Sequence, residues 1–204
     1  MIFTERTITL KNGRTCILKP PAPENAEEMI AYLKQIAGET PYMTRYPDEV
    51  KKDVEEERAF INRTLEDPNA VMIVAEADGK IAGTCSVFGN RDRRKISHRC
   101  SMGIGLLEDY CEQGLGTAML SMLIEFAKQM GYEVMELIVV ADNTRAQGLY
   151  RKCGFIEGGR YYHGMKFDDG SYHDEIMMYK DLEGGMGRCA RRKRRFGNTM
   201  TQIR

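Results

Sequence analysis

The sequence lacks the features that mark several protein classes. No apolar run among its 204 residues approaches the roughly 20 that are needed to cross a bilayer. Residues 1–6 lack the basic stretch, apolar core and cleavage site of a secretory signal, so we expect a cytoplasmic protein with no membrane partner. The sequence also has no Gly-Lys-Ser/Thr of a nucleotide-binding loop and no internal repeat.

Signals for metal sites and disulfides are scarce. The six cysteines include no Cys-x-x-Cys pair, the spacing typical of zinc and redox sites. We expect reduced thiols that mostly pack as small apolar groups. His163 and His173 flank the last predicted hairpin and are expected to face each other or solvent, because no third ligand stands nearby in the sequence. We therefore expect no metal.

Charge is unevenly distributed, although the formal net charge is zero. Residues 183–204 hold seven basic residues against Glu183 alone, so this segment carries +6 and residues 1–182 carry −6. We predict one domain over residues 1–182, followed by a basic, disordered tail over 183–204. Nucleic acid is not expected as a partner, because Phe196 is the only aromatic residue interleaved with the basic run.

Turn residues and apolar periodicity predict a mixed α/β domain. Alternating stretches joined by Asn12-Gly13, Asp78-Gly79 and Asp169-Gly170 predict hairpins over 4–19, 70–88 and 155–182. Apolar runs predict two more strands at 99–107 and 134–140, the second of them buried. Helical spacing predicts helices at 23–35, 50–65, 115–130 and 144–153. Strand runs with helices between them are typical of a single mixed domain.

A glycine-bearing turn between the strand at 99–107 and the helix at 115–130 has the properties of an anion site. Gly114 and Gly116 let the backbone approach a ligand, and the first helical turn presents unpaired N–H groups to a pyrophosphate. The same glycines would also suit a sharp turn with no ligand, and spacing alone does not decide between the two. Met119 replaces the third glycine of a dinucleotide fingerprint.

A second motif covers residues 143–155 and reads Asn-x-x-Ala-x-x-Leu-Tyr-x-x-x-Gly-Phe. Together with the earlier Gly-x-Gly, it resembles the GNAT superfamily of acyl-CoA-dependent N-acetyltransferases. The resemblance runs from about 73 to 182 and is strongest from 102 to 155. It implies a mixed, mostly antiparallel sheet flanked by helices, acetyl-CoA as cosubstrate, and a primary amine as acceptor. That amine belongs either to a small molecule or to a protein or peptide.

The resemblance also implies roles for particular residues. Tyr150 would act as general acid toward the departing CoA thiolate, although a tyrosine in a helix is also commonly a packed residue. Asn143 would contact the pantetheine arm, and the pantetheine amides would pair with the backbone of Ile104, Gly105 and Leu106. The pyrophosphate would be held by Glu112, Gln113, Gly114, Leu115, Gly116 and Thr117.

This sequence departs from the family pattern in two places. Cys111 stands where an arginine or glutamine commonly begins the pyrophosphate loop, which should weaken CoA affinity without abolishing it. Ser101 and Ile138 stand where many relatives carry a glutamate as general base. An amine with a pKa of about 10 must lose a proton before it attacks, so the base lies elsewhere or is a water chain. His98 and Glu76 are weak candidates.

The missing glutamate leaves a second hypothesis open: a GNAT-like domain that binds acyl-CoA and regulates a partner without catalysis. For an enzyme, the negative charge of the body favours a cationic acceptor, although it does not identify one. The resemblance implies that residues 20–46 build the wall of the acceptor site. A homodimer is common in the family, and the sequence does not decide whether one forms.

Overall fold

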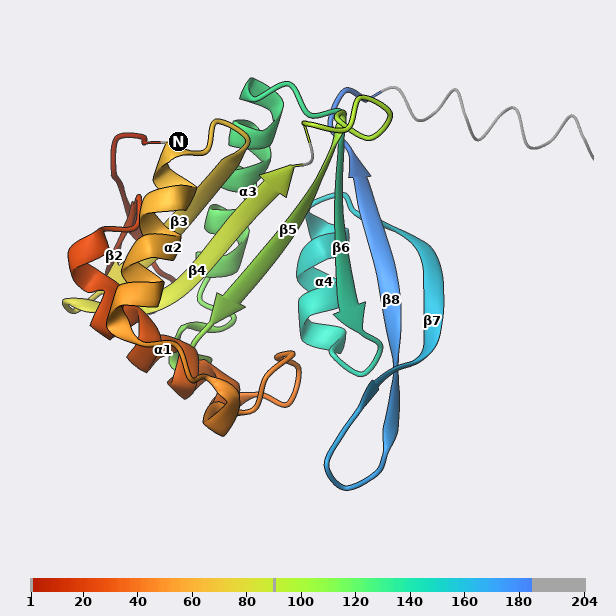
Figure 1. Cartoon of the computed structure of the whole chain (residues 1–204), viewed down its shortest axis with the longest axis horizontal. Coiled ribbons are helices and arrows are strands. Elements are labelled where there is room, and N and C mark those ends of the chain that lie inside the picture. The colour runs from red at the N-terminus through yellow and green to blue at the C-terminus, as the bar shows by residue number, and fades with distance from the viewer. Residues whose placement is uncertain (1, 90, 185–204) are drawn as a thin grey trace, which may run out of the picture.

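The computed structural model describes residues 2–89 and 91–184, in which the strands form one sheet (Figure 1). The spatial order is β1-β2-β3-β4-β5-β6-β8-β7, and β5 with β6 is the one parallel pair among the described strands. The sheet is therefore mixed and mostly antiparallel, as predicted. The strands are β1 Arg6–Thr9, β2 Thr15–Lys19, β3 Ala70–Ala77, β4 Lys80–Gly89, β5 Arg99–Leu106, β6 Val134–Val140, β7 Ile156–Lys166 and β8 Tyr172–Asp181.

Helices cover both faces of the sheet. Figure 1 shows α1 and α2 on one face and α3 and α4 on the other. The predicted helix at 50–65 begins later, at Val54, because Asp53 caps it by accepting the Glu56 N–H at 2.8 Å. No helix among the described residues is long and apolar enough to cross a membrane. The helices are α1 Ala26–Glu39, α2 Val54–Glu66, α3 Leu115–Gln129 and α4 Thr144–Lys152, with short 3-10 helices η1 Pro23–Asn25, η2 Pro47–Glu49 and η3 Glu108–Tyr110.

The core has two parts, one on each face of the sheet. The larger part packs α3 against the strands, because its apolar residues recur at helical spacing and form one buried stripe. This stripe includes Leu115, Met119, Leu120 and Leu123, all without exposed surface. The smaller part packs α1 against β3 and β4. Apolar burial therefore holds helices against both faces of the sheet, and this packing fixes the position of each helix N-terminus.

The parallel pair β5 and β6 separates along its length. The two strands pair only where Arg99–Ser101 lies beside Val134–Glu136, and they then diverge, as Figure 1 shows. Within the described residues, the stretch of β5 beyond Ser101 has no strand partner on its β6 side. The prediction that 134–140 is wholly buried is wrong at Ile138, which is 55% exposed. This side chain faces the split between the strands.

Candidate active site

A cavity of about 1080 Å³ occupies the split between β5 and β6. Its walls come from both strands, from the N-terminal turns of α3 and α4, and from α1 with the loop that follows it. Most of the residues predicted for the site line this cavity: Ile104, Gly105, Leu106, Glu112, Gly114, Gly116, Thr117, Asn143 and Tyr150. Gln113 and Leu115 are not among the lining residues. Leu115 is fully buried in the core.

The free edge of β5 supplies one wall. Ile104, Gly105 and Leu106 pair with β4 on one side and border the cavity on the other. The Gly105 carbonyl already accepts a hydrogen bond from the buried Tyr32 hydroxyl at 2.9 Å. A Cβ at 105 would lie 2.6 Å from the Ile36 Cδ1 methyl and 3.0 Å from the Tyr32 hydroxyl, so α1 packs closely on this glycine. The remaining polar groups of this edge are available to an extended ligand.

The turn before α3 has the backbone shape of an anion site. Glu112 and Gly114 both have positive φ angles, of 59° and 91°, and a non-glycine residue in that region is strained. The turn leads into the first amides of α3, which lack intrahelical acceptors. Gly116 lines the cavity and also lies close to α4, since a Cβ there would lie 3.0 Å from Leu149. It serves the packing of α3 on α4.

A lysine that sequence reasoning missed lies at this turn. The Lys11 ammonium donates to the Glu112 carbonyl oxygen at 2.9 Å, and its backbone N–H donates to the Gln113 carbonyl at 3.0 Å. Lys11 also lines the cavity, together with Lys152 and Arg145. No motif could have found it, because the contact joins residues about a hundred positions apart.

Tyr150 projects from α4 into the cavity and is only 7% exposed. Burial raises the pKa of its phenol to about 12, so the hydroxyl keeps its proton throughout the physiological range. Within the described part of the chain this hydroxyl has no hydrogen-bond partner, although the ring packs against Phe155 with centroids 6.0 Å apart. The group is therefore an unused donor inside the cavity.

Asn143 has a structural role that the family motif did not indicate. Its side-chain oxygen accepts the Ala146 N–H at 3.1 Å and so caps α4. The cap occupies the carboxamide oxygen and leaves the NH₂ group free to face the cavity. The carboxamide of Gln147 fixes the same corner by donating to the Ala141 carbonyl at 2.7 Å.

We expect Asn143→Ala to lower the free energy of unfolding by about 1 kcal/mol, because the first turn of α4 loses its cap. Asn143→Asp keeps a capping oxygen and should retain nearly the wild-type stability. Urea denaturation followed by circular dichroism measures both variants. Equal stability of Asn143→Ala and wild type would contradict the capping role.

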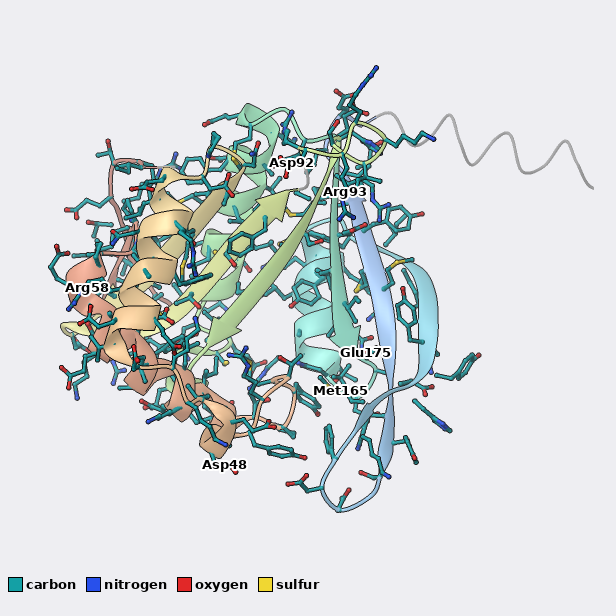
Figure 2. The ribbon with its side chains drawn as sticks, in the orientation of Figure 1. Asp48, Arg58, Asp92, Arg93, Met165 and Glu175 are labelled. Atoms are coloured by element: carbon teal, nitrogen blue, oxygen red, sulfur yellow. The ribbon has the colours of Figure 1, made fainter. Side chains whose placement is uncertain are left out.

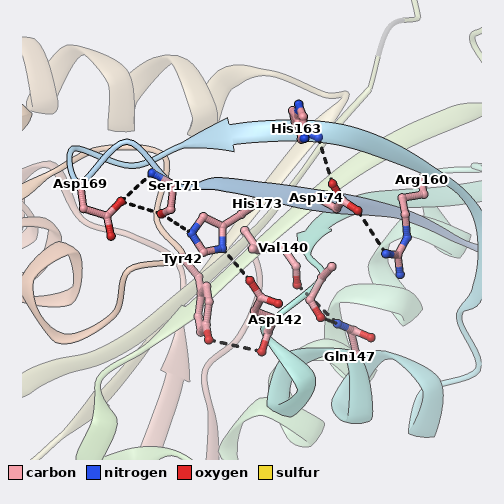
Figure 3. Close-up of polar contacts among 11 residues, drawn as sticks. Tyr42, Val140, Asp142, Gln147, Arg160, His163, Asp169, Ser171, His173 and Asp174 are labelled. Atoms are coloured by element: carbon pink, nitrogen blue, oxygen red, sulfur yellow. Dashed lines mark hydrogen bonds and ion pairs between the residues drawn. The ribbon is translucent and has the colours of Figure 1, made fainter.

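The rim of the cavity is held by a polar chain on the β7–β8 hairpin (Figure 3). His173 Nδ1 lies 2.6 Å from Asp142, its Nε2 lies 2.9 Å from the Ser171 hydroxyl, and that hydroxyl donates to Asp169 at 2.6 Å. This series of hydrogen-bonded residues resembles a hydrolytic triad in composition only. The Ser171 proton is directed at a carboxylate, and none of the four residues lines the cavity. The chain instead fixes the hairpin to the end of β6.

Two tyrosines of the loop after α1 contact this part of the rim, one at the end of β6 and the other at the β7–β8 turn. The Tyr42 hydroxyl donates to the Asp142 carbonyl at 3.3 Å, and the Tyr46 hydroxyl accepts the Asp168 N–H at 2.8 Å. His163 and His173 do not face each other: His163 is exposed and stacks on Tyr172, whereas His173 stacks on Phe167. The described residues contain no group of three His, Cys, Asp or Glu arranged to hold a metal.

The weak candidates for the base lie outside the cavity. Glu76 pairs with Lys19 at 2.5 Å, and neither Glu76 nor His98 is among the lining residues. Ser101, at one of the positions where many relatives carry a glutamate, donates its hydroxyl hydrogen to Glu136 at 3.4 Å. Sequence reasoning missed the acidic residue of the β7–β8 hairpin that does line the cavity, Glu175. Its position at the cavity depends on how the hairpin folds.

The cysteines largely follow expectation. Cys16, Cys85 and Cys100 are buried, and Cys189 lies outside the described residues. Burial raises the pKa of the Cys111 thiol, whose Sγ lies 3.6 Å from the Leu107 carbonyl oxygen. A protonated thiol is a poor nucleophile, which argues against a mixed disulfide with CoA at this position.

The sequence model of the Acetyltransferase (GNAT) family matches residues 30–155, more than half of the chain. The protein therefore belongs to the GNAT family of acetyl-CoA-dependent N-acetyltransferases. This confirms the family resemblance drawn from the two motifs.

Two relatives differ in their acceptors. A Bacillus subtilis protein described as a candidate alanine N-acetyltransferase of ribosomal protein bS18 is 33% identical over 101 residues, 50% of this chain and 64% of that protein. The phosphinothricin N-acetyltransferase of Alcaligenes faecalis is 31% identical over 141 residues, 68% of this chain and 70% of that protein. The match thus covers slightly less than two thirds of the first relative.

Solved structures share the fold. A GNAT-family acetyltransferase from Streptococcus pneumoniae superposes with a TM-score of 0.77 at 28% identity, covering 81% of this chain and 99% of that one. A phosphinothricin acetyltransferase from Sinorhizobium meliloti, solved in complex with acetyl-CoA, superposes with a TM-score of 0.71 at 16% identity, covering 82% and 88%. The predicted fold class is confirmed.

Proposed function

We propose that this protein moves the acetyl group of acetyl-CoA to a primary amine that attacks the thioester directly. One observation carries the proposal. A single cavity joins the free edge of β5, the anion-binding turn before α3 and the unpartnered hydroxyl of Tyr150. These three features suit the pantetheine arm, the pyrophosphate and the thioester sulfur in that order. The match in chemistry along the cavity supports acetyl-CoA as the cosubstrate.

In this proposal, the pyrophosphate lies against the amides that follow Gly114, and Lys11 adds a positive charge. Residues 104–106 pair with the pantetheine amides, and the free NH₂ group of Asn143 donates to the same arm. Acetyl-CoA supplies an activated acetyl thioester. Tyr150 donates its hydroxyl hydrogen to the departing sulfur. Because its pKa of about 12 exceeds the roughly 8.5 of a thiol, hydrogen bonding contributes more than complete proton transfer.

A second, mostly apolar cavity of about 440 Å³ adjoins the first and suggests where the body of the acceptor lies. The two share five residues in their walls: Glu39, Thr40, Met43, Thr44 and Met165. Part of the region 20–46 lines both cavities, in keeping with its expected place as the acceptor wall. We propose an acceptor with a primary amine next to an apolar part. The acceptors in the names of the two relatives, an alanine N-terminus and phosphinothricin, are the first to try.

We also propose that residues 1–182 form the catalytic domain and that the protein works in the cytoplasm, as is typical of the family. The expectation of a disordered basic tail over 183–204 falls almost wholly outside the described residues. Only residues 183 and 184 of that segment are described. Nucleic acid and membrane are not proposed as partners. Size-exclusion chromatography with light scattering would decide whether a homodimer forms.

Two measurements test the proposed function. Calorimetry should show acetyl-CoA binding near micromolar affinity, about −8 kcal/mol. CoA release should then appear with at least one of phosphinothricin, an alanyl peptide and spermidine. Binding without release on any of these amines would favour the non-enzymatic regulatory module. Absence of binding would contradict both hypotheses.

Lys11→Ala should weaken acetyl-CoA binding about threefold to tenfold and reduce its salt dependence, because one cation leaves the pyrophosphate site. Lys19→Ala is the matched control, since Lys19 pairs with Glu76 and does not line the cavity. Calorimetric titrations at two salt concentrations compare the three proteins. Equal losses in both variants would mean that Lys11 has no specific role.

A further inference from the structure

Four carboxylates line the main cavity in the described part of the chain, and three have other roles. Arg145 holds Glu108 through two hydrogen bonds of 2.7 Å. Glu39 accepts the Glu108 N–H at 2.7 Å, and Glu112 lies on the pyrophosphate turn. Glu175 is the fourth, and its carboxylate has no hydrogen bond or ion pair with any described residue. It is the acidic group that remains for a ligand.

A bulge in β7 makes room for this carboxylate. The pairing of β7 with β8 shifts register between Tyr161 and Met165, and His163 adopts a strained φ of 55° there. A Cβ on Gly164 would lie 2.4 Å from a Glu175 carboxylate oxygen. The Glu175 side chain therefore occupies space that only a glycine at 164 leaves open.

Charged groups around the bulge are already paired. Asp174 accepts the His163 N–H at 3.0 Å and a hydrogen bond from Arg160 at 3.2 Å. His173 contacts Asp142, and the Lys166 ammonium lies over the Tyr172 ring at 5.2 Å. These contacts stabilise the bulge and leave Glu175 without a competing partner. Strain held in place by neighbouring contacts is a frequent feature of functional sites.

Glu175 lines the main cavity at the far end of β6. It pairs with Val140 at the end of β6, and Val140 also lines the main cavity. Met165, which belongs to the walls of both cavities, lies on the same stretch of the hairpin (Figure 2). The hairpin that carries Glu175 thus also contributes, through Met165, to the wall that the two cavities share.

We propose that Glu175 is the general base that deprotonates the acceptor amine. The inference rests on the proposed function and deepens it. The Glu175 carboxylate takes one proton from the ammonium form and passes it to solvent. The nitrogen lone pair then forms the N–C bond, the C–S bond breaks with its electron pair going to sulfur, and nitrogen loses its second proton. That second proton also goes to solvent, while sulfur takes up one proton through Tyr150, which solvent reprotonates, so each turnover releases one proton, the amide and CoA.

The test compares Glu175→Gln with wild type, using acetyl-CoA and the best acceptor among phosphinothricin, an alanyl peptide and spermidine. At pH 7, kcat/KM should fall about 100-fold to 1000-fold, while the Kd for acetyl-CoA stays unchanged. The variant should recover about tenfold per pH unit toward the pKa of the amine, because only the neutral amine then reacts. Glu157→Gln, on the same hairpin and outside the cavity, is the matched control and should behave as wild type.

Gly164→Ala is a second variant that leaves the carboxylate in the chain and displaces it from its place. It should show a loss of the same kind, with unchanged acetyl-CoA affinity as the check on folding. Wild-type kcat/KM in Glu175→Gln, or a loss that is equal at every pH, would overturn the assignment while leaving the acetyltransferase function intact. Failure of wild type to release CoA with any acceptor would overturn both.

Discussion

Replacing Gly114 with glutamate is expected to weaken acetyl-CoA binding by at least about 100-fold. Gly114 has a φ of 91°, where a residue with a side chain is strained by about 1–2 kcal/mol. The new carboxylate would also repel the phosphates at the N-terminus of α3 and compete with them for the unpaired amides, which favour any anion. Both effects oppose the bound state, and calorimetric titration measures their sum.

Two controls separate charge from backbone strain. Gly114→Ala introduces the strain alone and should lose much less affinity than Gly114→Glu. Gly79→Glu introduces the same charge and a similar strain, since Gly79 has a φ of 72° at the β3–β4 turn, outside the cavity. It should cost stability and leave acetyl-CoA binding unchanged. Wild-type affinity in Gly114→Glu would remove the pyrophosphate site from this turn.

Tyr150→Phe is expected to lower kcat about 10-fold to 100-fold and to leave the Kd for acetyl-CoA nearly unchanged. The variant keeps the ring that packs against Phe155 and removes only the hydroxyl that would donate to the leaving sulfur. Because burial raises the pKa of the phenol to about 12, the donor stays protonated over the whole practical range. The effect should therefore be nearly independent of pH, unlike that of Glu175→Gln.

Tyr132→Phe is the matched control for Tyr150→Phe. Tyr132 is also buried, but its hydroxyl donates to the Asn69 carbonyl at 2.9 Å and does not line the cavity. The control should lose stability, because the Asn69 carbonyl loses its donor, and should keep its kcat. Equal kcat in wild type and Tyr150→Phe over a range of pH would show that Tyr150 is only a packed residue.

Local sequence signals predicted the elements well. Asn12-Gly13, Asp78-Gly79 and Asp169-Gly170 are followed by returning strands because a turn needs particular residues at particular φ angles. Helical apolar spacing predicted α3 to within a residue at its C-terminal end, since the buried stripe decides which residues continue the helix. The two largest errors in a boundary are equal in size: α1 continues to Glu39, beyond the predicted end at 35, and α2 begins at Val54 because Asp53 caps it.

The amino-acid sequence by itself determined the mixed α/β class, the family and the turn that begins α3, because each depends on residues close together along the chain. Only the tertiary structure decided that β5 and β6 diverge, that Lys11 reaches the turn before α3 and that Glu175 lines the cavity. The physical reason is that these features join distant segments. The place of Glu175 depends on a register shift in β7 and on the space beside Gly164, and neither leaves a periodic signal in the sequence.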